Sequence, residues 1–237
     1  MKKYLFAITF VTLLSSCETA KQILDTYGQN TGALTQGQIT SGLKEALTIG
    51  TQNSTSTLSN IDGFFANAAI KILMPDEAKQ VESTLRSFGL GGVVDKAVLS
   101  MNRAAEDATK GATDIFIGAI KQMTIQDALG ILKGGDFAAT NYFKDKTTLA
   151  LINSFRPTIE NALKNTNATK YWKDVFTAYN TFSSKPVNTD LTAYVTGKAV
   201  DGIFYQVGLE EQKIRKDPMA RVTDILKKVF GSKEAQG

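Results

Sequence analysis

A helix start opens the region 35–47, whose sequence is Thr35-Gln36-Gly37-Gln38-Ile39-Thr40-Ser41-Gly42-Leu43-Lys44-Glu45-Ala46-Leu47. Its first four residues have the spacing of a capping box, which begins a helix. Ile39, Leu43 and Leu47 recur every four residues and therefore share one helix face. We expect this helix to begin a domain and to end in the Thr/Ser/Asn-rich run 51–57.

The same three- and four-residue apolar spacing continues to Gly231, with few prolines to interrupt it. Pro157 predicts a kink or a break, and Asp217 followed by Pro218 predicts the start of the last helix. These patterns predict an all-α, single compact domain of about nine to eleven helices. After the first helix, the expected helices cover 75–89, 93–109, 124–134, 136–143, 146–165, 169–182, 191–216 and 218–230.

The N-terminus has the features of a lipoprotein leader. Lys2 and Lys3 precede an apolar run over 5–14, which is too short to span a bilayer. The four residues Leu14-Ser15-Ser16-Cys17 resemble the lipobox of bacterial lipoproteins, in which the cysteine is acylated and becomes the mature N-terminus. We therefore expect cleavage between Ser16 and Cys17 and a lipid on Cys17.

This leader divides the chain into four predicted parts: a signal peptide (1–16), an acylated cysteine with a flexible tether (17–34), a helical domain (35–231) and a disordered tail (232–237). The lipid would hold the domain to a membrane outside the cytoplasm. We expect it in the bacterial cell envelope, at the periplasmic face of the outer membrane.

Composition removes several classes of chemistry. The chain has no histidine, which is the commonest general base and the commonest metal ligand. Its one cysteine would carry the lipid, so no thiolate nucleophile is left. Its 27 basic and 23 acidic residues are mixed along the sequence, without the basic stripe of a nucleic-acid surface. We expect no metal, no cofactor, no nucleic-acid partner and no catalytic residue.

Four motifs could form a functional site, although each of them occurs more often in proteins with an ordinary structural role. Gly89–Gly92 precedes a predicted helix as a phosphate loop would, but lacks the rest of that motif. Glu82 followed by serine resembles the acid of lytic transglycosylases without their groove motifs. The acidic pairs Glu106-Asp107 and Glu210-Glu211 could bind Ca²⁺ or Mg²⁺, but lack a calcium-loop spacing.

Charged pairs and aromatic residues on the predicted helices are the remaining candidates. Arg103 with Glu106, Arg156 with Glu160, and Glu211 with Arg215 have the spacing of helix-surface ion pairs. The helix 169–182 is rich in aromatic residues, which could line a ligand pocket but are more often core. Its candidate pocket residues are Tyr171, Trp172 and Tyr179.

Several stretches resemble an uncharacterised bacterial family of exported helical proteins, domain of unknown function 4197. They are 39–47 (ITSGLKEAL), 99–106 (LSMNRAAE), 119–124 (AIKQMT), 155–157 (FRP), 194–196 (YVT) and 214–221 (IRKDPMAR). The resemblance implies an all-helical domain in the cell envelope and carries over no catalytic residue or ligand. Because Arg103, Glu106, Arg156 and Arg215 lie in or beside these stretches, they are our candidate polar or ligand-contacting positions.

Three functions remain open. The first is a non-enzymatic envelope protein that binds a ligand or partner in a groove between helices. The second is a carboxylate-dependent hydrolase of envelope glycan or peptidoglycan, which would need two converging acidic side chains or one desolvated glutamate. The third is a structural scaffold within an envelope complex.

Overall fold

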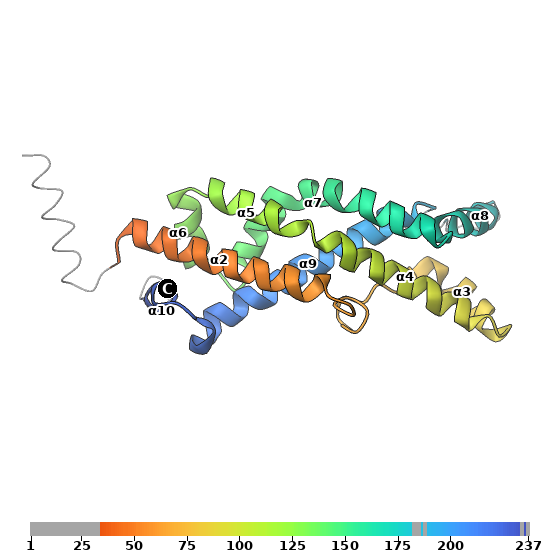
Figure 1. Ribbon diagram of the computed structural model, residues 1–237, viewed down its shortest axis with the longest axis horizontal. Coiled ribbons are helices and arrows are strands. Elements are labelled where there is room, and N and C mark those ends of the chain that lie inside the picture. The colour runs from red at the N-terminus through yellow and green to blue at the C-terminus, as the bar shows by residue number, and fades with distance from the viewer. Residues whose placement is uncertain (1–33, 182–185, 187–188, 233–234, 236–237) are drawn as a thin grey trace, which may run out of the picture.

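The structure, a computed structural model, describes residues 34–181, 186, 189–232 and 235, apart from the side chains at positions 171, 174, 175, 178 and 179 (Figure 1). These residues form nine α-helices and two 3-10 turns, with no strand among them, which confirms the all-α prediction. The elements are α2 Gln36–Ser59, η1 Asp76–Ala78, α3 Lys79–Ser87, α4 Gly91–Thr109, α5 Ala112–Gln122, α6 Ile125–Lys133, α7 Ala138–Asn165, α8 Ala168–Asn180, α9 Leu191–Lys216, η2 Pro218–Ala220 and α10 Asp224–Phe230.

Long helices run roughly along the length of an elongated bundle (Figure 1). Helix α9 packs against α7, α2 and α4 and so joins the bundle together. The start of α2 lies beside α6 and α10 at one end, whereas α3 and α8 lie at the other. Aromatic side chains fill the centre, where Phe116 meets Phe143 edge-on with 5.1 Å between ring centroids.

The first helix begins as predicted but extends further. Thr35 accepts a hydrogen bond from the Gln38 N–H, and the Gln38 side chain accepts one from the Thr35 N–H. The expected end within 51–57 is wrong, because α2 continues to Ser59. The hydroxyls of Thr51 and Ser54 donate to carbonyls four residues earlier and are buried, so they do not compete with the helix.

The predicted break between 143 and 146 is also wrong. Helix α7 is continuous over its 28 residues, and Pro157 lies inside it without ending it. Asp136 does not cap this helix, since its carboxylate pairs with Lys216. The first amides of α7 are instead satisfied by Glu211, which lies 72 residues from Ala139 in the sequence.

The last helix begins later than predicted. Asp217 accepts the N–H of Met219, so it caps the turn η2, and α10 starts at Asp224 behind a cap from Thr223. Met219 lies in η2 and Val222 follows it, and they are 87% and 66% exposed, so neither lies on a buried helix face. Local capping signals mark a turn and a helix equally well, and here they mark a turn.

No single helix of the described residues is long and apolar enough to cross a membrane. Helices α5 and α6, which meet at 106°, satisfy the length and composition criteria only when they are taken together as a bent pair.

Close contact between α9 and the segment before α3 depends on Gly202. A Cβ atom at this position would lie 2.4 Å from the Phe64 ring, which is fully buried. Gly197, on an exposed part of the same helix, has open space around it.

We predict that Gly202→Ala lowers the free energy of unfolding by about 1–3 kcal/mol, because the buried ring must shift to admit the methyl group. Gly197→Ala should be neutral or stabilising by up to about 1 kcal/mol, since alanine favours helix. Urea unfolding followed by circular dichroism measures both. Equal effects at the two positions would contradict the close packing of Phe64 on α9.

Candidate functional site

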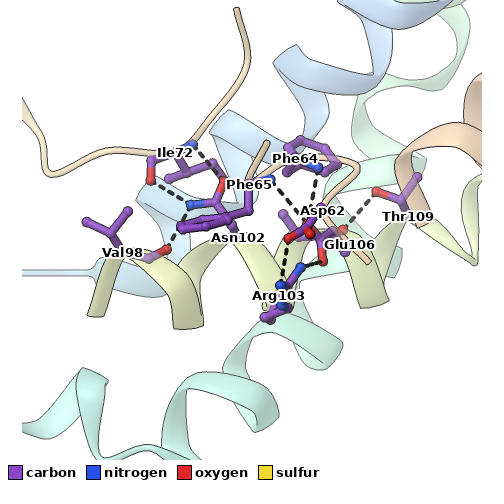
Figure 2. Close-up of polar contacts among 10 residues, drawn as sticks. Asp62, Phe64, Phe65, Ile72, Val98, Asn102, Arg103, Glu106 and Thr109 are labelled. Carbon is purple, nitrogen blue, oxygen red and sulfur yellow. Dashed lines mark hydrogen bonds and ion pairs between the residues drawn. The ribbon is translucent and has the colours of Figure 1, made fainter. Parts of the chain in front are cut away.

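The chain between α2 and α3, residues 60–75, consists of turns and irregular segments without a helix, and we call it the strap. Its backbone is bound by Asn102 of α4. The Asn102 side chain accepts the Ile72 N–H at 2.9 Å and donates to the Ile72 carbonyl at 2.8 Å. The Asn102 side-chain NH2 group also donates a hydrogen bond to the Val98 carbonyl (Figure 2). Asn102 therefore satisfies a buried peptide that has no helical partner.

Glu106 binds the strap one turn further along α4. One carboxylate oxygen accepts the N–H groups of Phe64 and Phe65 at 3.1 and 3.2 Å. The other oxygen accepts from Arg103 at 2.7 Å. Figure 2 shows Asn102 and Glu106 both directed at the strap. The buried charge is thus fully hydrogen-bonded, as burial of a carboxylate requires.

Arg103 extends this cluster to the surface. Its guanidinium also pairs with Asp62 at 2.7 Å and lies 5.7 Å from the centre of the Phe65 ring. Hydrogen bonds to Glu106 and then to Asp62 raise the pKa of Arg103 above its ordinary value. Asp62 has a φ of 70°, which is costly for a residue other than glycine, so the ion pair holds a strained turn in place.

A second buried carboxylate, Glu211, performs the same task for two other helices. Its oxygens accept the N–H groups of Ala139 and Thr140 at 2.9 and 2.8 Å, at the start of α7. Arg215 pairs with Glu211 and also donates to the Ile131 carbonyl at 2.7 Å, at the end of α6. One ion pair therefore satisfies the unpaired backbone groups of two helix ends.

The four candidate polar residues fall into three separate contact groups. Arg103 pairs with Glu106 and Arg215 with Glu211, as their spacing predicts, but the expected position on the helix surface is wrong, because both carboxylates are buried. The expected pair of Arg156 with Glu160 is wrong, because Arg156 binds Asp190 at 2.7 Å and Glu160 binds Lys164.

Asp190 caps α9, and Arg156 helps to hold that cap. Burial alone would raise the pKa of Asp190, but hydrogen bonds from Arg156 and the Ala193 N–H outweigh it, so the pKa lies below its ordinary value. This pairing of α7 with the start of α9 joins residues 34 positions apart.

The predicted aromatic pocket is only partly described. Trp172 is buried, with its ring 4.4 Å from that of Phe176, so it packs in the core. The side chains of Tyr171 and Tyr179 lie outside the described residues, as do Ser16 and Cys17.

The acidic motifs are dispersed rather than convergent. Asp107 pairs with Lys110 at the surface, away from the buried Glu106, and Glu210 accepts from Asn53. Glu82 binds Arg86 on the surface of α3. Over the described residues, no group of three or more acidic or cysteine side chains is arranged to hold a metal ion.

A groove of about 610 Å³ lies between the strap and α9, and we call it the strap groove. One wall is the chain from Ala69 to Lys79, and the other presents Tyr194, Lys198 and Tyr205 from α9. The Tyr194 hydroxyl donates to the Leu73 carbonyl at 2.9 Å, which ties the two walls together. Burial, reinforced by Asp76 and Glu77, raises the pKa of Tyr194.

Sequence reasoning missed this groove and the role of Asn102. A signal for Asn102 was present, because it shares the helical spacing of Val98 and Ala105 and so falls on the apolar face of α4. A polar residue at such a position must bond to something inside the protein.

Comparison with known families agrees with the resemblance seen in the sequence. The family model described as "Protein of unknown function (DUF4197)" matches residues 33–231. The chain belongs to this family. No match was found among curated proteins or among solved structures. Membership in DUF4197 covers every described helix but gives no activity, so the function must be argued from the fold.

We predict that Glu106→Gln lowers the free energy of unfolding by about 1–3 kcal/mol, because an amide cannot both accept the strap N–H groups and face Arg103. The neighbouring Asp107→Asn, which alters only an exposed pair, should change it by less than about 0.5 kcal/mol. Urea unfolding of both variants makes the comparison. A Glu106→Gln protein as stable as the parent would show that the carboxylate does not hold the strap.

Proposed function

We propose that this chain is a lipid-anchored protein of the bacterial cell envelope whose helical domain binds a ligand or partner protein in the strap groove, without catalysing a reaction. The observation that carries this proposal is the groove itself, whose walls are fixed by hydrogen bonds between segments far apart in the sequence.

The fixed walls favour binding. Asn102 holds the strap at Ile72, and Tyr194 holds it at the next residue, Leu73. A surface that is already ordered loses little conformational entropy when a partner binds. The strap is therefore held at Ile72 and Leu73, between α4 and α9.

The lining of the groove has the character of a protein-binding surface. Leu73 and Tyr205 supply exposed apolar and aromatic area, 56% and 44% exposed. Acidic Asp201 and basic Lys198 stand beside them on α9. Aromatic residues are enriched in interfaces between proteins, which have a polar rim, whereas pockets for small molecules are mostly apolar.

The buried carboxylates support a role without catalysis. Glu106 and Glu211 both lie outside the lining of the strap groove, and each is occupied by two backbone N–H groups and an arginine. A general acid needs a proton to donate and access to the substrate. Neither carboxylate has that access, so the hydrolase alternative gains no support from them.

The anchor is supported by the leader sequence. A basic start, a short apolar run and the lipobox-like residues before Cys17 precede the domain. The mass of the mature N-terminus, measured on protein purified from its own membrane, tests this part separately.

We predict that the protein purified from its membrane carries a bound molecule, which native mass spectrometry would detect. Tyr205→Ala should reduce the bound fraction about tenfold, because it removes the aromatic anchor. Leu149→Ala, at a residue on α7 that is 77% exposed and outside the groove, should leave it unchanged.

Two results would contradict binding in the strap groove. One is a parent protein that carries nothing when isolated under native conditions. The other is a bound molecule that remains equally abundant in the Tyr205→Ala protein.

A further inference from the structure

The end of the bundle nearest the start of α2 has an exposed face of mixed apolar and basic character. We call residues 213–228 the end face, which comprises the last turn of α9, η2 and most of α10. Helix α10 packs against α2, and a Cβ atom at Gly42 would lie 2.7 Å from Val229. Figure 1 shows this face at the end of the bundle where α2 begins.

Two apolar side chains of the end face point to solvent. Met219 is 87% exposed and Val222 is 66% exposed, in the turn between α9 and α10. Arg221 fixes this turn, because its guanidinium donates to the carbonyls of Ile214 and Arg215 at 3.1 and 2.8 Å. The apolar side chains are therefore displayed outward by a turn with a defined conformation.

The end face is also the most basic part of the domain. Its residues 213–228 include six basic and two acidic side chains, whereas the whole chain has 27 and 23. Four of the six are exposed lysines, and three of these form ion pairs with Glu210, Asp136 and Asp224, of which the pairs with Glu210 and Asp224 are long, at 4.0 and 3.4 Å. The exposed basic residues are Lys213, Lys216, Lys227 and Lys228.

The proposed anchor brings this face to a membrane. Residues 18–34 join Cys17 to the domain, and a chain of this length spans at most about 60 Å. Tethering of this kind gives an effective concentration of about 1 mM, so weak contacts are enough for docking. Apolar side chains beside lysines match the surface of a bilayer that contains anionic lipid.

We infer that the end face lies on the bilayer, with Met219 and Val222 among the headgroups and the lysines beside anionic lipid. This inference rests on the proposed lipid anchor. A second apolar group, Phe88 with Leu90 and Val93, is exposed at the α3–α4 turn, but Figure 1 shows those helices at the opposite end from the start of α2. It therefore serves as the control.

Because lipid would occupy the only native cysteine, a new cysteine can be labelled selectively. The acylated chain carrying Val222→Cys, labelled with a polarity-sensitive fluorophore, is reconstituted into phosphatidylcholine vesicles with and without phosphatidylglycerol. The matched control carries the label through Phe88→Cys. We expect a blue shift and quenching by spin-labelled lipid at 222, stronger with phosphatidylglycerol, and neither change at 88.

Neutralising two lysines tests the electrostatic part. Adding Lys227→Gln and Lys228→Gln should lower the docking equilibrium constant about 25-fold, given about 1 kcal/mol for each lysine near an anionic surface. High salt should act in the same direction.

Each remaining outcome overturns the inference at a different step. A chain that does not co-float with vesicles lacks the anchor, and docking fails with it. A chain that co-floats but keeps the label at 222 in water has its anchor and no docking. A label at 88 that enters the bilayer instead would show that the opposite end faces the membrane.

Discussion

A carboxylate that accepts two backbone N–H groups, as Glu106 does from Phe64 and Phe65, is the contact on which the middle of this structure depends. Much of the strap is exposed and folds into hydrogen-bonded turns, but the amides of Phe64, Phe65 and Ile72 have no partner in those turns and need one from elsewhere. Glu106 and Asn102 supply them from successive turns of α4. Phe64 can then fill the space above Gly202, and the groove beside α9 acquires its wall.

The same solution recurs at the start of α7, where Glu211 accepts two amides and Arg215 reaches the end of α6. In both places an arginine three or four residues away balances the buried charge. A buried ion pair contributes little net stability when its desolvation is counted. What these pairs contribute is a defined alignment of segments, because removing either partner leaves a buried charge or buried amides unsatisfied.

Local rules predicted much of the fold. The capping box at Thr35, the position of α6 within 124–134, the bounds of α9 and the pairs of Arg103 and Arg215 follow from spacing along one helix. The failures have another cause, which is contact between distant segments. Glu211 accepts the first amides of α7 although it lies 72 residues from Ala139 in the sequence. Arg156 forms its ion pair with the distant Asp190 and not with Glu160 on its own helix. The strap groove could not be predicted at all, since its walls meet only after folding.

Helix α9 is continuous from Leu191 to Lys216, and this continuity has a mechanical consequence. Tyr205 in the strap groove and Lys216 on the end face belong to one rod, about 16 Å apart along its axis. A molecule bound in the strap groove would therefore lie at a fixed distance from a surface that contacts the end face. Because one continuous helix carries both, the α9 wall of the strap groove and the last turn of α9 keep a fixed separation.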